Sequence, residues 1–437
     1  MGIYKSLRKK VTDKTAVITV VGLGYVGLPM AIAFAKKGYK VNGFDTSTKR
    51  IDNLHKGISY INDVSSGEIR EVVKSGRFHV SGEETILSGS DVLIICVPTP
   101  LRKTKVPNIS YVVQASRTVA RYLRRGQMII LESTTYPGTT RDVILTILRK
   151  TGLALDKDFF LSFSPERIDP GNPDYDFTNI PKVLGSFTED GRKLGKELYS
   201  KVIKTVVDVS SPEVAEVTKL LENTFRIVNI GLINEFSHLC HKLGIDVWEV
   251  IEAAKTKPFG FMPFYPGPGI GGHCIPKDPV YLSWKARKVG FETRLIDIAA
   301  EVNRNVPTHM VERIITILGK YGKKVHGSKV LILGVTYKKD VNDLRESPAL
   351  DIIKLLAKKG ADISYHDPYI PYLDIGGIRS ESIVLSKKTL RTFDIAVITA
   401  DHSSLNYKEI VDCSNLIFDT RNILTKLNLT GKKTVRL

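Results

Sequence analysis

The sequence predicts an α/β fold in which two Rossmann-like, doubly wound parallel-sheet domains are joined by a central α-helical domain. Three observations support this: a strand–turn–helix–strand unit over residues 15–44, a long helical stretch over 212–243, and a second strand–helix–strand unit after residue 329. Strands that alternate with helices are typical of parallel sheets covered on both faces. The expected domains are residues 1–209, 210–310 and 311–437.

The first unit begins with a β-branched run at residues 15–21, followed by a helical pattern over 28–37 and a strand over 40–44. Residues 1–13 are interpreted as a basic lead-in, although Met1 and Gly2 fit a loose myristoylation pattern. The charge-free stretch 15–35 is not expected to span a membrane, because glycines and Pro29 interrupt it. Further strands are expected at 92–97, 128–132, 159–164 and 183–184, with helices over 110–124 and 139–150.

The middle of the chain is expected to be helical over residues 212–243, 247–254 and 294–304, with a loop rich in Gly and Pro over 258–279. A second strand, helix and strand follow at 330–334, 348–359 and 362–365. In both units an acid, Asp45 or Asp367, stands seven residues after a glycine. The second unit retains only Gly334 of the glycine pattern, so its ligand should be held differently.

Composition fits a globular protein and excludes several other classes. The chain has 437 residues, 42% hydrophobic and 25% charged, which excludes a disordered, collagenous or polytopic membrane protein. Its net charge of +18 raises the question of a polyanionic partner. The basic residues lie in scattered clusters without interleaved aromatic residues or the spacing of known nucleic-acid motifs, so we expect solvated surface charge and no nucleic-acid partner.

The segment Gly22-Leu23-Gly24-Tyr25-Val26-Gly27 follows a strand, opens a helix and precedes Asp45 by eighteen residues. In this context Gly22 permits a tight turn, Gly24 lets a pyrophosphate approach the backbone, and Gly27 allows close helix packing. Asp45 would accept hydrogen bonds from both ribose hydroxyls and repel a 2′-phosphate. The segment therefore predicts NAD binding in preference to NADP, although Lys49 and Arg50 weaken that preference.

Cys274 stands in the segment Gly271-Gly272-His273-Cys274-Ile275-Pro276-Lys277-Asp278. A thiol among glycines is sterically open, and a nearby lysine favours its thiolate, so Cys274 is the predicted nucleophile. Cys96 and Cys240 lie in apolar segments and are expected to be buried and inert. The four cysteines show no disulfide framework, which favours the cytoplasm. His238, Cys240 and His241 lie close together, but no further ligands converge on them, so no metal is expected.

Lys219 and Asn223 lie four residues apart on the expected long helix, so their donors share one face. Such donors can hold an alkoxide or oxyanion, although K-x-x-x-N also occurs in one-step β-hydroxyacid dehydrogenases. With an NAD site and a cysteine nucleophile, the residues indicate two oxidations in one active site: alcohol to aldehyde, then thiohemiacetal to thioester, which water releases as an acid.

These residues resemble the UDP-glucose/GDP-mannose dehydrogenase family over nearly the whole chain. The motifs that carry the resemblance are GLGYVGLP at 22–29, LESTTYPG at 131–138, SPER at 164–167, Lys219 with Asn223, GGHCIPKD at 271–278 and GVTYKKDVNDLRESPAL at 334–350. The resemblance implies four-electron, NAD-dependent oxidation of the C6 alcohol of a nucleotide sugar, and a long middle helix that forms a homodimer or higher homo-oligomer.

The resemblance also implies a role for each matched position. The implied catalytic residues are Cys274, Lys219, Asn223, Asp278, Glu166 and Thr134. The implied cofactor-binding residues are Gly22, Gly24, Tyr25, Val26, Gly27, Asp45, Arg50, Pro98, Thr99, Ser133, Thr134, Lys277 and Arg345. The implied substrate-binding residues are Glu166, Arg167, Ile168, Lys219, Asn223, Gly271, Tyr337, Lys338 and Arg421.

Within the family, the segment 164–172 followed by Ile180-Pro181-Lys182-Val183 is most similar to UDP-N-acetylglucosamine 6-dehydrogenases of surface-polysaccharide pathways. The expected substrate is therefore UDP-N-acetylglucosamine. UDP-glucose and UDP-N-acetylmannosamine remain alternatives because a few pocket side chains decide between them. More remote alternatives are a one-step β-hydroxyacid dehydrogenase and a nucleotide-binding or nucleic-acid-binding protein without catalysis.

Overall fold

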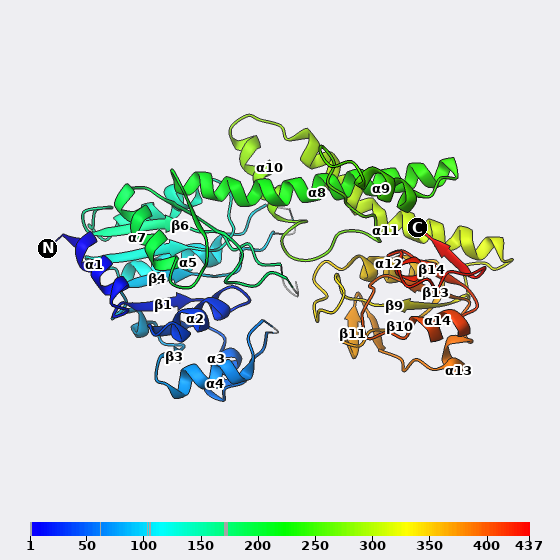
Figure 1. The fold of residues 1–437 in the computed structure, drawn as a ribbon, viewed down its shortest axis with the longest axis horizontal. Coiled ribbons are helices and arrows are strands. Elements are labelled where there is room, and N and C mark those ends of the chain that lie inside the picture. The colour runs from blue at the N-terminus through cyan, green and yellow to red at the C-terminus, as the bar shows by residue number, and fades with distance from the viewer. Residues whose placement is uncertain (1, 62, 103, 105, 170–173) are drawn as a thin grey trace. The chain divides into compact units, whose positions relative to one another are not determined.

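The computed structural model describes residues 2–61, 63–102, 104, 106–169 and 174–437 (Figure 1). The chain divides into two compact units: Met1–Glu222 with Trp284–Phe291, and Asn223–Ser283 with Glu292–Leu437. The three-domain division remains a prediction. The boundary expected after residue 310 falls inside helix α11 (Arg294–Lys320), which continues through Pro307.

The first unit contains an eight-stranded sheet in the order β3-β2-β1-β4-β5-β6-β7-β8. Its strands are β1 (Val17–Val21), β2 (Lys40–Phe44), β3 (Phe78–Ser81), β4 (Val92–Ile95), β5 (Gln127–Leu131), β6 (Phe159–Phe163), β7 (Lys182–Ser186) and β8 (Val206–Val209). The first six strands in this order are parallel, as expected. Strand β7 runs antiparallel to β6, so the parallel arrangement ends there, and β8 is parallel to β7. The chain order reverses between β1 and β4, which is where doubly wound sheets bind ligands.

Helices cover both faces of this sheet. They are α1 (Ile3–Thr12), α2 (Gly27–Lys36), α3 (Thr48–His55), α4 (Ser66–Lys74), η1 (Glu84–Leu87), α5 (Ser110–Arg121), η2 (Thr140–Leu145), α6 (Thr146–Arg149) and α7 (Glu189–Tyr199). Helices α1, α2 and α7 contribute to one apolar core, and α5, η2 and α6 to the core on the opposite face. The helix expected over 139–150 is thus a π-helical segment followed by a short α-helix.

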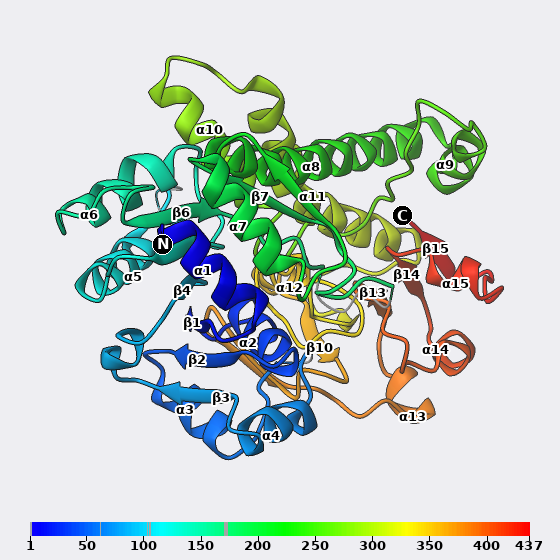
Figure 2. The same ribbon diagram turned by 60° about the vertical axis from the view of Figure 1, so that its left-hand side comes forward.

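The interpretation of residues 1–13 as a basic lead-in is wrong, because Ile3–Thr12 form helix α1, which lies beside α2 and α7 (Figure 2). Leu7 and Val11 stand one turn apart and are buried at 2% and 0% exposure. Their apolar face packs into the core while the basic side chains remain at the surface, where Arg8 pairs with Glu197 at 2.8 Å. The amphipathic spacing of these two residues is the signal for the helix.

Four helices form the middle of the chain: α8 (Pro212–Leu243), α9 (Val247–Lys255), α10 (Asp278–Lys288) and α11. Helix α8 ends at Gly244, whose φ of 71° is readily adopted by glycine. The Asp246 side chain then caps α9 by accepting a hydrogen bond from the Trp248 N–H. Among the described residues, no helix has the length and apolar composition required to cross a membrane.

The second unit contains a five-stranded parallel sheet in the order β10-β9-β13-β14-β15 and a β11–β12 hairpin. Its strands are β9 (Lys329–Leu333), β10 (Asp362–His366), β11 (Tyr372–Ile375), β12 (Ile378–Glu381), β13 (Ile395–Ile398), β14 (Ile417–Asp419) and β15 (Thr434–Arg436). Its helices are α12 (Pro348–Lys358), α13 (Lys387–Leu390), α14 (Tyr407–Cys413) and α15 (Ile423–Lys426). Helices α11 and α12 pack on one face of the sheet, and α13, α14 and α15 on the other.

The two sheets repeat the same turn after their central strands. Gly22 follows β1 with a φ of 95°, and a Cβ there would lie 2.6 Å from the carbonyl oxygen of Cys96. Gly334 follows β9 with a φ of 84°, and its Cβ would lie 2.6 Å from the carbonyl oxygen of Ala400. Any other residue would be strained and would clash at either position. The repeat expected from the sequence is therefore present in the backbone.

Candidate active site

The turn after β1 leaves room for a pyrophosphate. A Cβ at Gly27 would lie 1.9 Å from the Gly22 carbonyl oxygen, so this position requires glycine for packing. Nothing lies within 4 Å of a Cβ placed at Gly24. Helix α2 begins at Gly27, and its first N–H groups favour an anion. The residues present therefore fit the diphosphate of a dinucleotide.

Asp45 directly follows β2 beside this turn and is 6% exposed. Its carboxylate accepts hydrogen bonds from the backbone N–H of Leu23 and of Ser47, each at 2.8 Å. The Arg50 guanidinium reaches the same carboxylate at 3.1 Å and also lies over the ring of Tyr60. Arg50 thus partly neutralises the charge that would repel a 2′-phosphate.

Replacing Asp45 by asparagine should weaken NAD binding about tenfold or more, because a charge-assisted hydrogen bond to the ribose is lost. The unpaired Arg50 should at the same time make NADP a better ligand. Titration with each nucleotide, followed by fluorescence, measures the ratio of the two affinities. The matched variant Asp45→Asn with Arg50→Met should lose the gain for NADP. An unchanged NAD affinity in Asp45→Asn would contradict the assignment.

The remaining residues assigned to the cofactor in the first unit lie at the carboxyl ends of neighbouring strands. Tyr25 and Pro98 are exposed, Val26 is half-buried and Thr99 is buried. Beyond β5, the Ser133 hydroxyl donates to the Val97 carbonyl oxygen at 2.8 Å. Thr134 is half-buried, as a group in contact with a ligand would be. The neighbouring Thr135 is 1% exposed, and its hydroxyl has no hydrogen-bond partner among the described residues.

Glu166 belongs to a buried cluster of charges. Its Oε1 accepts the backbone N–H of Arg167 at 2.6 Å and of Ile168 at 2.8 Å. The ammonium of Lys182, from β7, lies 3.2 Å from Glu166 Oε2 and 2.6 Å from Glu132 Oε2. Lys182 therefore joins two carboxylates and fixes the direction of the Glu166 side chain.

Glu132 is the most deeply buried member of this cluster and also accepts the hydroxyl of Tyr199. Burial raises the pKa of Glu132 to about 7, even though the charge of Lys182 acts in the opposite direction. The pKa of Lys182 is shifted upward, because the attraction of Glu132 and Glu166 outweighs the opposing effect of burial. No role for Lys182 was predicted from the sequence, although a lysine within an apolar strand pattern is a signal for one.

Arg167 and Glu216 tie helix α8 to the first sheet. Arg167 pairs with Glu222 at 2.7 Å and donates to the Pro181 carbonyl oxygen at 2.6 Å. Glu216, which is 1% exposed, accepts the N–H of Gly138 at 2.6 Å and the N–H of Thr140 at 2.9 Å. Both contacts hold the part of α8 that carries Lys219, which is 7% exposed. Residues Pro170, Gly171 and Asn172 of the predicted motif lie outside the described residues.

In the second unit, Cys274 lies in the loop before α10 and is exposed, whereas Cys96, Cys240 and Cys413 are buried, and none of the four forms a disulfide. The Cys274 carbonyl oxygen accepts the N–H of Lys277 at 3.0 Å and of Asp278 at 2.8 Å. Burial, followed by the charges of Lys277 and Arg345, lowers the pKa of the adjacent His273 to about 4. The same positive charges favour an anion in this loop.

Two further contacts organise the second unit. Asn223 Nδ2 donates to Asp278 Oδ2 at 2.6 Å, and both residues are buried. Tyr337 packs against the cysteine loop, since a Cβ at Gly271 would lie 2.4 Å from the Tyr337 Cβ.

Three basic residues assigned to ligands also lie in the second unit. The Arg421 guanidinium donates to the Thr399 carbonyl oxygen at 2.9 Å and lies beside Gly267. Arg345 pairs with Asp343 at 2.6 Å, and Lys338 lies in the loop after β9. The structure thus brings Asn223 together with Asp278, and Gly271 together with Tyr337, within one unit.

The histidine and cysteine cluster on α8 is not assembled as a metal site. Cys240 is buried against α9, and the His238 ring packs in a tilted arrangement against His309, with centroids 4.6 Å apart. In the ranges that the structure describes, no three His, Cys, Asp or Glu side chains are grouped so as to hold a metal.

The chain is similar to known proteins over most of its length. The chain matches the NAD binding domain of the UDP-glucose/GDP-mannose dehydrogenase family over residues 16–203, its central domain over 213–305 and its UDP binding domain over 331–426. It is 36% identical to the UDP-N-acetyl-D-mannosamine dehydrogenase of Pyrococcus horikoshii over 413 residues, 93% of this chain and 96% of the relative. It is 38% identical to the UDP-N-acetyl-D-glucosamine 6-dehydrogenase of Pseudomonas aeruginosa over 356 residues, 81% and 83% of the two chains.

The solved structure of the Pyrococcus horikoshii enzyme matches this chain with a TM-score of 0.87 and 34% identity. The match covers 96% of this chain and 98% of the solved chain. The chain therefore belongs to the UDP-glucose/GDP-mannose dehydrogenase family and is an NAD-dependent oxidoreductase.

Proposed function

We propose that this chain oxidises the C6 alcohol of a UDP-N-acetylhexosamine, with UDP-N-acetylglucosamine as its substrate, to the uronic acid used in surface polysaccharide. The observation that carries the proposal is that Cys274 is exposed in a glycine-rich loop. The Cys274 carbonyl oxygen accepts the N–H of Asp278. A one-step dehydrogenase needs no such thiol. The matches to an NAD binding domain and a UDP binding domain support the two ligands.

A bound NAD would supply the hydride acceptor for each of two oxidations at C6, and each oxidation also releases one proton to water. The first oxidation gives an aldehyde. The thiolate of Cys274 then adds to the carbonyl carbon, and Lys219 and Asn223 donate hydrogen bonds to the oxygen of the resulting thiohemiacetal. The second oxidation gives a thioester. Water, oriented by Glu166, Thr134 and Asp278, attacks its carbonyl carbon, the C–S bond breaks, and the acid and the thiol are released.

The stoichiometry of NADH tests this reaction. Two NADH should form for each UDP-sugar consumed, and the product should be a uronic acid by mass spectrometry. A ratio near one would instead support a one-step β-hydroxyacid dehydrogenase. DNA or RNA binding with a steep salt dependence, together with no reduction of NAD by any UDP-sugar, would support a protein without catalysis.

A substrate panel tests the identity of the sugar. The panel consists of UDP-N-acetylglucosamine, UDP-N-acetylgalactosamine, UDP-N-acetylmannosamine and UDP-glucose. UDP-N-acetylglucosamine should give the highest kcat/KM. The second candidate is UDP-N-acetylmannosamine, which is favoured by the relative from Pyrococcus horikoshii. A higher kcat/KM for that sugar would replace the proposed substrate and retain the mechanism.

We also propose that the protein forms a homodimer, or a higher homo-oligomer, in the cytoplasm. Helix α8 exposes a series of large apolar side chains, most of them three or four residues apart, which is the spacing of a helix that packs against another helix. They are Val214, Val217, Leu221, Phe225, Leu232, Phe236, Leu239 and Leu243. The free cysteines and the need for NAD support a reducing compartment.

A further inference from the structure

The second unit has the backbone of a dinucleotide-binding turn, but the acid beside this turn contacts a histidine of the protein. Asp367 directly follows β10 as Asp45 directly follows β2, and each carboxylate accepts the N–H of the residue that follows the glycine of the turn. Asp367 Oδ2 accepts three hydrogen bonds, from the N–H of Val335 at 2.7 Å, the N–H of Thr336 at 3.2 Å and Nε2 of His402 at 3.0 Å.

These contacts leave no access for a ribose. A carboxylate oxygen has about two acceptor sites, so Oδ2 of Asp367 is saturated. The side chains of Asp367 and His402 are both 0% exposed. Asp45 differs because its third donor is the partly exposed Arg50, which can move away from the carboxylate. In the second unit, the buried imidazole of His402 donates a hydrogen bond to Asp367. The corresponding acid of the first unit, Asp45, stays available for the cofactor.

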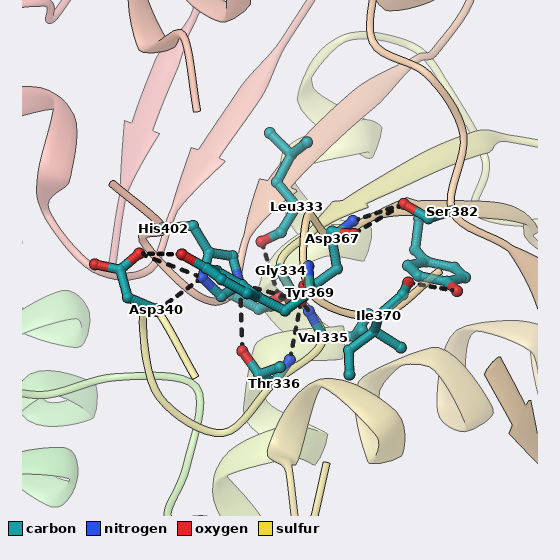
Figure 3. Close-up of polar contacts among 12 residues, drawn as sticks. Leu333, Gly334, Val335, Thr336, Asp340, Asp367, Tyr369, Ile370, Ser382 and His402 are labelled. Carbon is teal, nitrogen blue, oxygen red and sulfur yellow. Dashed lines mark hydrogen bonds and ion pairs between the residues drawn. The ribbon is translucent and has the colours of Figure 1, made fainter. Parts of the chain in front are cut away.

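The hydrogen bonds determine the tautomer of His402. Its Nδ1 lies 2.9 Å from the backbone nitrogen of Asp340, which is a donor, so Nδ1 must accept and the ring proton must be on Nε2 (Figure 3). Nε2 therefore donates to Asp367, and it also lies 3.2 Å from the Thr336 hydroxyl. The neutral ring thus joins the acid at the end of β10 to the far end of the loop after β9.

The same loop carries Tyr337 and Lys338, to which the family resemblance gives a role in binding the UDP-sugar. Thr336 donates its hydroxyl to the Lys338 carbonyl oxygen at 2.9 Å, two residues later. Beyond Lys338, the Asp340 carboxylate accepts the N–H of Ser403 at 2.8 Å and its hydroxyl at 2.6 Å. The loop is therefore fixed on both sides of Lys338, and His402 contacts both fixed points.

We propose that His402 is a positioning residue for the UDP-sugar: it accepts the Asp340 N–H and donates to Asp367, and so holds the loop that presents Tyr337 and Lys338. The inference rests on the proposed function, since it assumes that this loop binds the UDP moiety. In this proposal, the dinucleotide-type turn of the second unit supports the loop after β9. The side chain of His402 contacts Asp367 as a ribose would contact Asp45 in the first unit.

Two substitutions separate the hydrogen bonds of His402. Asparagine places an oxygen near the position of Nδ1 and keeps an acceptor for Asp340. Glutamine is closer to histidine in size, reaches Asp367 with its amide nitrogen and removes that acceptor. Because the Asp340 N–H would be left buried and unpaired, His402→Gln should weaken binding of UDP about tenfold or more. His402→Asn should be affected much less, although it is the smaller side chain.

Calorimetric titration with UDP alone, without NAD, measures these affinities. NADH affinity should stay within about twofold of wild type in both variants, and the KM for the UDP-sugar should rise more than kcat falls. His366→Gln is the matched control, because the only hydrogen bond that the structure describes for the His366 side chain is to the Ile383 carbonyl oxygen, at 2.7 Å. This variant should bind UDP normally. Ser403→Ala, at an exposed position, should weaken UDP binding by about threefold without disturbing the buried ring.

The outcomes distinguish the two proposals. If wild type does not bind UDP, the proposed function fails. If wild type binds UDP and the folded His402→Gln variant binds it equally well, or the Asn and Gln variants lose affinity equally, the role of His402 fails while the proposed function stands. Should His402→Gln not fold, a normal UDP affinity in Ser403→Ala would overturn the role on its own.

Discussion

Replacing Cys274 by alanine should abolish production of the uronic acid, with a fall in rate of roughly 10³-fold or more, because the covalent intermediate can no longer form. Binding should survive, since the side chain is exposed at the loop surface and supports no core. UDP and NADH affinities should therefore stay close to those of wild type while turnover is lost. The measurements are NADH formation, with mass spectrometry of the product, and titration of both ligands.

Cys240→Ala provides the matched control, because Cys240 is 6% exposed in the small core between α8 and α9. This variant should lose some stability and keep its specific activity. Alkylation of the native protein should label Cys274 before the three buried cysteines and inactivate it, and UDP-sugar should slow the labelling. Uronic acid made at the normal rate by Cys274→Ala would refute covalent catalysis.

The fold could be predicted from the sequence wherever one local rule determined the structure. The turn at Gly22 was predictable because only glycine fits at a φ of 95° with a carbonyl oxygen 2.6 Å from its Cβ position. Helix α1 was missed because its lysines and arginines outweigh Leu7 and Val11 in composition, although those two residues are the ones that it buries in the core. The antiparallel β7 was missed because strand direction depends on the path of the chain between strands, which hydrophobic pattern does not encode.

The candidate site divides in a similar way. Cys274, Asp45 and Asn223 were found from the motifs in which they stand, and the structure places each at the loop, strand end or helix expected. Lys182 and His402 were not assigned roles, because their functions depend on partners about 16 to 66 residues away along the chain. A buried lysine or histidine acquires its role from the acids that the fold brings to it, and those pairs are not visible in a local pattern.

Lys182→Met should destabilise the protein by about 3–5 kcal/mol at pH 8, because it removes one partner of a buried ion pair and leaves two carboxylates without a countercharge. Lys182 and Glu132 are 4% and 0% exposed, so water cannot replace the lost partner. Methionine matches the length and flexibility of the lysine side chain, which limits the packing change. Urea unfolding followed by circular dichroism measures the loss, and normal stability of this variant at pH 8 would contradict a charged cluster.

The loss of stability in Lys182→Met should be smaller at pH 5.5 than at pH 8. The direction of this pH dependence follows from the pKa of Glu132. In the folded protein, burial raises the pKa of Glu132 from its ordinary value of 4.5 to about 7. Its contribution to stability is therefore fully present below about pH 4.5 and is lost as the pH rises through about 7. Removing Lys182 removes an attraction that lowers this pKa, so the pKa rises further and more stability is lost at high pH.

The double variant Lys182→Met with Glu132→Gln should recover much of the stability at pH 8, because the glutamine is neutral and still accepts the Tyr199 hydroxyl. Its stability should also vary less between pH 5.5 and pH 8. Both variants should turn over slowly, since Glu166 loses the ammonium that lies 3.2 Å from its Oε2 and fixes its carboxylate. Recovery of stability without recovery of kcat would separate the structural role of Lys182 from its role in orienting Glu166. A loss in Lys182→Met that is equal at both pH values would show that packing, rather than charge, is what Lys182 contributes.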